Sequence, residues 1–193
     1  MKKVAVGVLI SGRGSNMEAL IDAARDPAYP ARIALVLSNK ADAGGLKIAR
    51  EAGIPTAVID HRPFGKDREA HERLVHQALT DAGVRIVALA GYMRVLTPWL
   101  VDAWAGRMIN IHPSLLPAYP GLDTHGRALG DGVAEHGCTV HLVTAGVDEG
   151  PVLGQARVPV LPGDDEATLA ARVLAAEHVL YPACLGQFAT NLA

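Results

Sequence analysis

The sequence alternates short apolar runs with longer amphipathic segments, and this alternation restricts the fold more than any other feature. Apolar runs rich in β-branched residues occupy 4–10, 32–38, 56–60, 85–91 and 108–112. Helical patterns lie between them at 17–25, 44–53 and 66–83, and a further helix is predicted to begin at Thr97-Pro98. Strands that alternate with helices over the first 112 residues predict a parallel, doubly wound sheet with helices on both faces.

The first apolar run is nearly continuous, as expected for a parallel strand that is covered on both faces. Its two preceding lysines give it a superficial likeness to a signal peptide, but the run leads into glycines and not into a small-residue cleavage site. Ser15 or Asn16 is expected to cap the helix that follows. Gly53 is expected to end the second helix in a left-handed conformation.

The last third of the chain follows a different pattern. Residues 137–143 and 151–160 read as two later strands, and the turn residues between them suggest an antiparallel pair. A long C-terminal helix is predicted from about residue 166, with Asp164 or Asp165 as its cap. Because no repeat, low-complexity tract or linker is evident, we expect one α/β domain over 1–193: a mostly parallel, Rossmann-like sheet with an antiparallel C-terminal strand.

The composition argues against several classes of protein. A net charge of -2 and an aromatic content of 4% do not favour a nucleic-acid-binding surface. The two cysteines, Cys138 and Cys184, form no Cys-x-x-Cys pair, which disfavours a disulfide scaffold and a zinc ribbon. No apolar run approaches the roughly 18 to 20 residues that a membrane span needs. We therefore expect a cytoplasmic protein that binds neither nucleic acid nor membrane.

Three polar segments, 11–16, 91–94 and 110–121, follow predicted strands, where open α/β sheets collect their ligands. The first, Ser-Gly-Arg-Gly-Ser-Asn at 11–16, is a glycine-rich turn before a helix, which suits an anion. It lacks the third glycine of a dinucleotide fingerprint, since Met17 stands there, and it lacks the Walker lysine. The turn therefore suits a single phosphate held by Gly14, Ser15 and Asn16, or else it is only a structural turn with a helix cap.

The segment Asn-Ile-His-Pro at 110–113 follows the fifth predicted strand. Side chains alternate along a strand, so Asn110 and His112 share one face. An amide and an imidazole suit a reaction with a tetrahedral oxyanion and a proton transfer, such as acyl transfer. Asp148, in a later turn, is a candidate carboxylate partner. Each of the three residues taken singly also has a structural interpretation, and no nucleophile elbow is present, which favours direct transfer between two substrates.

The remaining histidines give no metal-binding pattern. His71 and His76 are five residues apart, so they point about 140° away from each other around a helix. His61 and His178 have no ligand spacing either. We expect no metal site.

Several motifs together show that the sequence resembles the phosphoribosylglycinamide formyltransferases, a family of folate-dependent enzymes of purine biosynthesis. The motifs are LISGRGSN, SNKADAGGL, LAGYMRVL, NIHPSLLPAYPGLDTH, HGCTVHLV and VDEGPVLGQ, in the family's order and at its spacing. The resemblance runs through nearly the whole chain. It implies transfer of the formyl group of 10-formyltetrahydrofolate to the amine of glycinamide ribonucleotide, with no metal cofactor.

The resemblance also implies a role for each residue of the catalytic trio. Asn110 would stabilise the oxyanion of the tetrahedral adduct. His112 would support that charge and help to move the proton from the attacking amine. Asp148 would hold His112, favour its cationic form and help to relay protons through water.

The binding residues carry over in the same way. Gly14, Ser15 and Asn16 match the turn that binds the ribonucleotide phosphate, and Glu177 on the last helix matches a contact to the nucleotide substrate. The residues that match the folate site are Arg68, Met93, Arg94, Val95, Leu96, Asn110 and Val147. A phosphate-binding half at about 1–105 and a catalytic and folate half at about 106–193 are expected. The prolines and leucines of 113–121 are expected to form one wall of the cleft.

Related formyl-folate enzymes share part of the central motif. Methionyl-tRNA formyltransferase has a further C-terminal domain and formyltetrahydrofolate deformylase an N-terminal one, for which 193 residues leave no room. A binding module without catalysis is the other alternative, but it would be expected to lack Asn110, His112 or Asp148. We therefore expect the formyltransferase of purine biosynthesis, acting as a monomer or homodimer.

Overall fold

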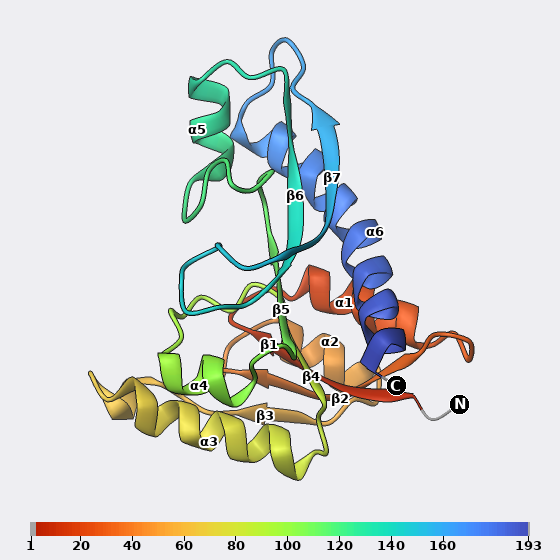
Figure 1. Cartoon of the computed structure of the whole chain (residues 1–193), viewed down its shortest axis with the longest axis vertical. Coiled ribbons are helices and arrows are strands. Elements are labelled where there is room, and N and C mark those ends of the chain that lie inside the picture. The colour runs from red at the N-terminus through yellow and green to blue at the C-terminus, as the bar shows by residue number, and fades with distance from the viewer. Residues whose placement is uncertain (1–2, 193) are drawn as a thin grey trace.

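One seven-stranded sheet organises the computed structural model, which describes residues 3–192 (Figure 1). The strand order is β3-β2-β1-β4-β5-β6-β7. The strands are β1 (Val4–Ile10), β2 (Ala31–Ser38), β3 (Thr56–Val58), β4 (Ile86–Leu89), β5 (Met108–His112), β6 (Glu135–Leu142) and β7 (Val152–Pro159). The pairs from β3 to β5 are parallel, and β6 is antiparallel to both β5 and β7. The predicted mostly parallel sheet with an antiparallel C-terminal part is confirmed.

Helices cover both faces of this sheet. They are α1 (Ser15–Ala24), α2 (Gly45–Glu51), α3 (Arg68–Asp81), α4 (Pro98–Ala103), α5 (Thr124–Gly130) and α6 (Glu166–Leu192), with a 3-10 turn at Arg62–Phe64. The sequence pattern did not predict α5, because two glycines in seven residues leave no helical periodicity to detect. All the longer helices were predicted.

Two apolar clusters result, one on each side of the sheet. Val6 and Val8 of β1 pack with α1, α2 and α6, whereas Ala5 and Leu9 pack with α3 and α4. All seven residues of β1 are buried, which explains its continuous apolar sequence. Gly7 belongs to the second side, where a Cβ would lie 2.4 Å from a Leu79 methyl group, so its lack of a side chain lets α3 pack closely.

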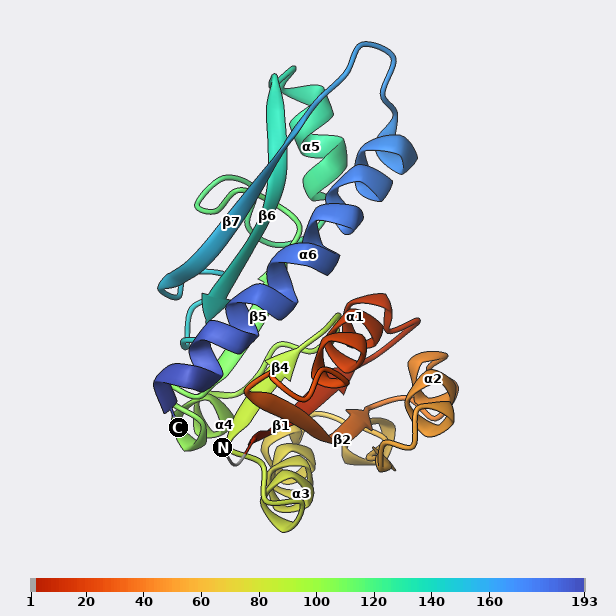
Figure 2. The same cartoon turned by 90° about the vertical axis from the view of Figure 1, so that its right-hand side faces the viewer.

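Helix α6 runs from the β6–β7 pair to the parallel sheet and joins these two parts (Figure 2). Its Tyr181 is fully buried, and the hydroxyl group donates to the carbonyl oxygens of Leu89 (2.9 Å) and Ile109 (3.3 Å). Ile109 immediately precedes Asn110 in β5. The hydroxyl of Tyr181 therefore fixes α6 against the strand that carries the predicted catalytic amide.

We expect Tyr181→Phe to lower the free energy of unfolding by about 1–3 kcal/mol, because it removes one buried hydroxyl donor and leaves the shape of the ring unchanged. Thermal and denaturant unfolding would measure this loss. The matched control is Tyr119→Phe, whose hydroxyl makes an exposed bond to Asp131 and should contribute less. Equal stability of Tyr181→Phe and the wild type would contradict the role of this hydroxyl.

The ends of three helices show which cap predictions were correct. Gly14, with φ +77°, occupies the N-cap of α1, and no side chain caps the helix, so the expectation for Ser15 or Asn16 was wrong. The amide of Asn16 instead reaches α6. At the start of α6, the Asp165 carboxylate accepts from the N–H of Thr168 (2.8 Å), as predicted, while Asp164 binds Arg172. Gly53 ends α2 with φ +74°, also as predicted.

Among residues 3–192, no helix combines the length and the apolar character that crossing a membrane requires.

Candidate active site

The loops that follow β1, β2 and β4 meet at the carboxyl edge of the parallel sheet. Ser11, which follows β1, joins them: its N–H donates to Gly91 O, and its hydroxyl accepts from the N–H of Met93 (2.8 Å) and donates to Asn39 (2.6 Å). Ser11 is buried, so these bonds form away from water. Of the three segments predicted to meet at this edge, those after β1 and β4 are joined directly by the hydrogen bonds of Ser11, which also connects the loop after β2.

Asn110 and His112 lie at the end of β5 on the same side of the strand. Their neighbours across the antiparallel ladder are His141 and Thr139 on β6. His112 is almost fully buried, with 6% of its surface exposed. The antiparallel register therefore adds a second histidine to the pair that the sequence identified.

Both ring nitrogens of His112 face oxygen atoms. Nε2 donates to the carbonyl of Tyr119 (2.9 Å), and Nδ1 lies 3.4 Å from Oδ2 of Asp148. A doubly protonated imidazolium would have an oxygen partner for each of its N–H groups. Each nitrogen of His112 therefore has an oxygen atom in reach as a hydrogen-bond acceptor.

Asp148 reaches His112 from the loop between β6 and β7. Its backbone has φ +55°, a left-handed conformation that few residues with side chains adopt. Its Oδ2 accepts from the N–H of Gly121 (2.9 Å), and its Oδ1 lies 3.7 Å from Nε2 of His141. The carboxylate therefore sits between two histidines and is held by the segment that follows β5.

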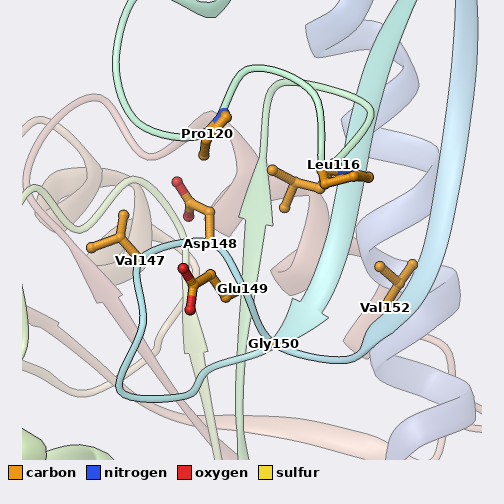
Figure 3. A pocket seen from close by; sticks show the side chains of 8 residues that line it. Leu116, Pro120, Val147, Asp148, Glu149, Gly150 and Val152 are labelled. Carbon is orange, nitrogen blue, oxygen red and sulfur yellow. The ribbon is translucent and has the colours of Figure 1, made fainter.

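The proline-rich segment after β5 faces Asp148 across a pocket (Figure 3). Figure 3 shows the Asp148 carboxylate pointing toward Pro120. The pocket is lined by Leu116, Pro117, Pro120, Val147, Asp148, Glu149, Gly150 and Val152. As expected from the sequence, prolines and a leucine of 113–121 form one of its walls, and the lining is apolar apart from two carboxylates.

Buried hydrogen bonds fix this wall to the sheet. The hydroxyl of Thr139 accepts from the N–H of Leu116 (3.0 Å) and donates to the carbonyl of Ser114 (2.7 Å), and Gln155 donates to Leu116 O (2.8 Å). Thr139 and Ser114 are fully buried. Strands β6 and β7 therefore hold the wall in place.

The glycine-rich turn has a backbone conformation that depends on Gly14. Its φ is +77°, and a Cβ at this position would lie 2.9 Å from Gly45 Cα. A side chain is therefore excluded, and the turn packs closely against the start of α2. The N–H groups of the first turn of α1, which include Ser15 and Asn16, are free of any side-chain cap. This is the arrangement in which a helix N-terminus binds an anion.

Glu177 connects this turn to α6. Its Oε2 accepts from the Nδ2 group of Asn16 (2.6 Å), and the residue is 6% exposed. Burial raises the pKa of Glu177, while the Asn16 bond opposes the shift. Oδ1 of Asn16 is buried without a partner. Because Glu177 lies one helical turn before Tyr181, the same helix contacts both the turn and β5.

We expect Glu177→Gln to be more stable than the wild type at neutral pH. A raised folded-state pKa means that the folded protein binds more protons than the unfolded chain above about pH 4.3, so wild-type stability falls as pH rises through this range. The Tm advantage of the variant should therefore grow between pH 4.5 and 7. Glu51→Gln, at an exposed surface pair, is the control and should show no such trend. A Tm difference between Glu177→Gln and the wild type that does not change with pH would contradict a raised pKa of Glu177.

The residues predicted to bind folate come from several elements: Arg68 from α3, 93–96 from the loop after β4, Asn110 from β5 and Val147 from the loop between β6 and β7. Arg68 begins α3 and donates to the carbonyl of Val95 (3.0 Å). Met93, Val95 and Val147 expose more than half of their surfaces, at 64%, 63% and 56%. Arg94 and Leu96, from the same loop, are half-buried. Of these exposed apolar side chains, Val147 lines the pocket, and an exposed apolar surface next to a pocket suits a flat aromatic ligand.

Two functional candidates escaped the sequence analysis. Glu72 is buried, and its carboxylate accepts from the N–H (2.9 Å) and the hydroxyl of Thr97, so it fixes the end of the loop after β4. His141 contacts Asn110 and Asp148. The alternation of β6 places His141 on the same side as Thr139, but only the ladder register between β5 and β6 shows that this side meets Asn110.

The predicted residues thus form connected groups. The structure brings Asn110, His112 and Asp148 together, and it joins Asn16 to Glu177. Among the described residues, no group of three or more His, Cys, Asp or Glu side chains is arranged to hold a metal ion.

The chain is similar to known formyl transferases in sequence and in fold. The formyl transferase family model matches residues 2–185. Phosphoribosylglycinamide formyltransferase of Escherichia coli is 49% identical over 182 residues, which cover 94% of this chain and 85% of that protein. The crystal structure of phosphoribosylglycinamide formyltransferase from Brucella melitensis is 55% identical, with a TM-score of 0.93 over 97% of this chain and 96% of that one.

Longer proteins contain a similar segment. The human trifunctional purine biosynthetic protein adenosine-3 is 49% identical over 184 residues, and the match covers 95% of this chain but only 18% of the human protein. The Drosophila pseudoobscura protein of the same name is 51% identical, with 14% of its length covered. The chain therefore spans less than a fifth of these relatives but most of the bacterial enzymes, and it belongs to the formyl transferase family, among the phosphoribosylglycinamide formyltransferases.

Proposed function

We propose that this protein transfers the formyl group of 10-formyltetrahydrofolate to the amine of glycinamide ribonucleotide, in purine biosynthesis. The observation that carries the proposal is the meeting of Asn110, His112 and Asp148 at the sheet edge, beside an apolar pocket. The two substrates follow from the fact that this chain belongs to the phosphoribosylglycinamide formyltransferases. We further propose that the enzyme acts in the cytoplasm, as a monomer or homodimer, without nucleic acid or membrane partners.

In the proposed reaction the ribonucleotide amine attacks the formyl carbon, and the carbonyl oxygen becomes an oxyanion. An N–H of Asn110 donates to this oxygen, and the His112 imidazolium supports its charge. A proton passes from the attacking nitrogen to the folate nitrogen, with Asp148 helping through water, and the bond between the formyl carbon and that nitrogen breaks. The formyl group thus moves without a covalent enzyme intermediate.

His112 must change one contact to take part in this reaction. Its Nε2–H donates to Tyr119 O in the structure, and Tyr119 has φ +54°. We propose that the oxyanion replaces this carbonyl as the acceptor. Asp148 would keep its contact with Nδ1 throughout and so preserve the orientation of the ring.

The two substrates are proposed to approach from different elements. The phosphate of the ribonucleotide would bind at the N-terminus of α1, through Gly14, Ser15 and Asn16, with Glu177 contacting the rest of the nucleotide. The folate would lie along Arg68 and the loop of Met93, Arg94, Val95 and Leu96, with Val147 and Asn110 against its ring. The apolar wall around Leu116 and Pro120 supports this, because it would keep water from the formyl group.

Hydrolysis of the formyl-folate is the second candidate, because the same three side chains could direct water to the formyl carbon. The uncapped N-terminus of α1, which we propose binds the phosphate, argues for the ribonucleotide, since water needs no phosphate site. Formyl transfer by the purified protein, with glycinamide ribonucleotide, water and initiator tRNA compared as acceptors, tests the proposal. We expect transfer only to the ribonucleotide. Equal turnover without it would overturn the assignment.

A further inference from the structure

The reaction proposed above leaves His141 without a role, although this histidine touches two members of the trio. His141 lies on β6 directly opposite Asn110 and is 2% exposed. Its Nε2 lies 3.3 Å from Nδ2 of Asn110 and 3.7 Å from Oδ1 of Asp148. A buried imidazole in this position needs a defined proton arrangement, because each tautomer presents a different group to its neighbours.

The backbone decides which nitrogen of His141 carries the proton. Nδ1 lies 2.8 Å from the carbonyl oxygen of Leu142, and a carbonyl can only accept. Nδ1 must therefore donate, and in a neutral ring Nε2 is then an acceptor. Burial lowers the pKa of His141, which favours this neutral ring over the imidazolium.

This tautomer fixes the orientation of the Asn110 side chain. An unprotonated Nε2 can bond only to a donor, so Asn110 must turn its NH₂ group toward β6, as the 3.3 Å contact shows. The opposite orientation would set the amide oxygen against the nitrogen lone pair. One N–H of Asn110 is then used by His141, and the second N–H of the same group remains available for the substrate oxygen.

A neutral His141 also affects Asp148. The carboxylate lies between His112 and His141, at 3.4 Å and 3.7 Å. If His141 were charged, it would compete with His112 for this carboxylate. When His141 is neutral, the negative charge of Asp148 interacts mainly with His112, the histidine proposed to support the oxyanion.

We propose that His141, held by Leu142 O as the neutral Nδ1–H tautomer, is a positioning residue that orients the amide of Asn110 for oxyanion stabilisation. This inference rests on the proposed formyl transfer. It adds a residue that touches neither substrate and acts through Asn110.

Two substitutions separate the bonds that His141 makes. His141→Gln places an amide near the position of Nε2 and keeps an acceptor for Asn110, whereas His141→Asn keeps only a donor for Leu142 O. We expect His141→Asn to lower kcat by about 10-fold or more, because a misoriented Asn110 would lose part of the rate that one oxyanion donor contributes. KM for both substrates should stay within about threefold of the wild-type value. His141→Gln should recover most of this loss. Equal losses in both variants, or none, would overturn the proposal.

A double-mutant cycle tests whether His141 acts through Asn110. In an Asn110→Ala background the amide is absent, so adding His141→Asn should slow kcat by no more than about twofold. A purely structural role would instead multiply the two effects. Multiplicative losses in variants with matched thermal stability would therefore contradict a positioning role.

The tautomer is measurable in the wild-type protein, independently of folding defects and of activity. Imidazole ¹⁵N shifts at pH 7.5 should identify a neutral His141 with its proton on Nδ1. A proton on Nε2, or a charged ring, would overturn the inference. Wild-type protein that lacks formyl transfer would overturn the proposed function alone, because the tautomer measurement does not depend on it.

Discussion

Replacing His112 by alanine is expected to lower kcat by roughly 10² to 10⁴-fold, the range that a positioned acid–base group contributes. Both nitrogens of the His112 ring have oxygen partners, and the N–H group at Nε2 is the donor proposed to support the oxyanion. Removal of the ring would also leave Asp148 without its 3.4 Å contact to Nδ1. Steady-state kinetics with both substrates would measure the loss. KM should change much less than kcat, because the interaction is made in the transition state.

A histidine elsewhere in the fold provides the control for this experiment. His76 on α3 packs its ring against Trp99 (5.4 Å between centroids) and Trp104 (5.7 Å), in a cluster without proposed substrate contacts. His76→Ala should lower Tm through lost packing and leave kcat near the wild-type value. Wild-type kcat in His112→Ala would contradict the proposed chemistry.

Replacing Asn110 by alanine is expected to have the second large effect, a loss of roughly 10² to 10³-fold in kcat. This is the range found in other enzymes when one oxyanion donor is removed. The amide supplies a neutral N–H at the place where negative charge develops. Because Asn110 is half-buried beside His141, few water molecules can substitute for this donor. Initial-rate measurements at saturating concentrations of both substrates would give kcat directly.

Asn110→Asp is the sharper form of the same test. It keeps the size of the side chain but replaces the NH₂ donor by a second carboxylate near Asp148. We expect at least the loss seen with alanine, because like charge would oppose the oxyanion. An Asn110→Asp variant with kcat above that of Asn110→Ala would contradict oxyanion stabilisation by this amide.

The sequence alone predicted the parts of the fold that depend on local pattern. The continuous apolar run of β1 predicted a strand covered on both faces, and the structure buries all seven of its residues. The strand position of Asn110 and His112 predicted that the two side chains share one face, which follows from alternation alone. These features need no knowledge of distant segments.

Contacts between distant segments were harder to predict. The residues alone offered Asp148 only as a candidate, because its contact with His112 depends on a φ of +55° in a loop 36 positions later. His141 was missed because its meeting with Asn110 depends on the register between β5 and β6. Ser15 or Asn16 was expected to cap α1, but Gly14, with a φ of +77°, takes the N-cap position, so both residues lie inside the helix. The Nδ2 group of Asn16 is then directed at the buried Glu177 on α6, 161 residues away, a contact that the local pattern does not show.

The most direct test of the account is a rapid-quench experiment with 10-formyltetrahydrofolate labelled in its formyl group. With the wild-type protein and glycinamide ribonucleotide, the label should move to the ribonucleotide amine in a single turnover, with no labelled protein and no formate. Without the ribonucleotide the label should remain on the folate. Label on the protein, or formate released at the same rate without the amine, would contradict direct transfer by Asn110, His112 and Asp148.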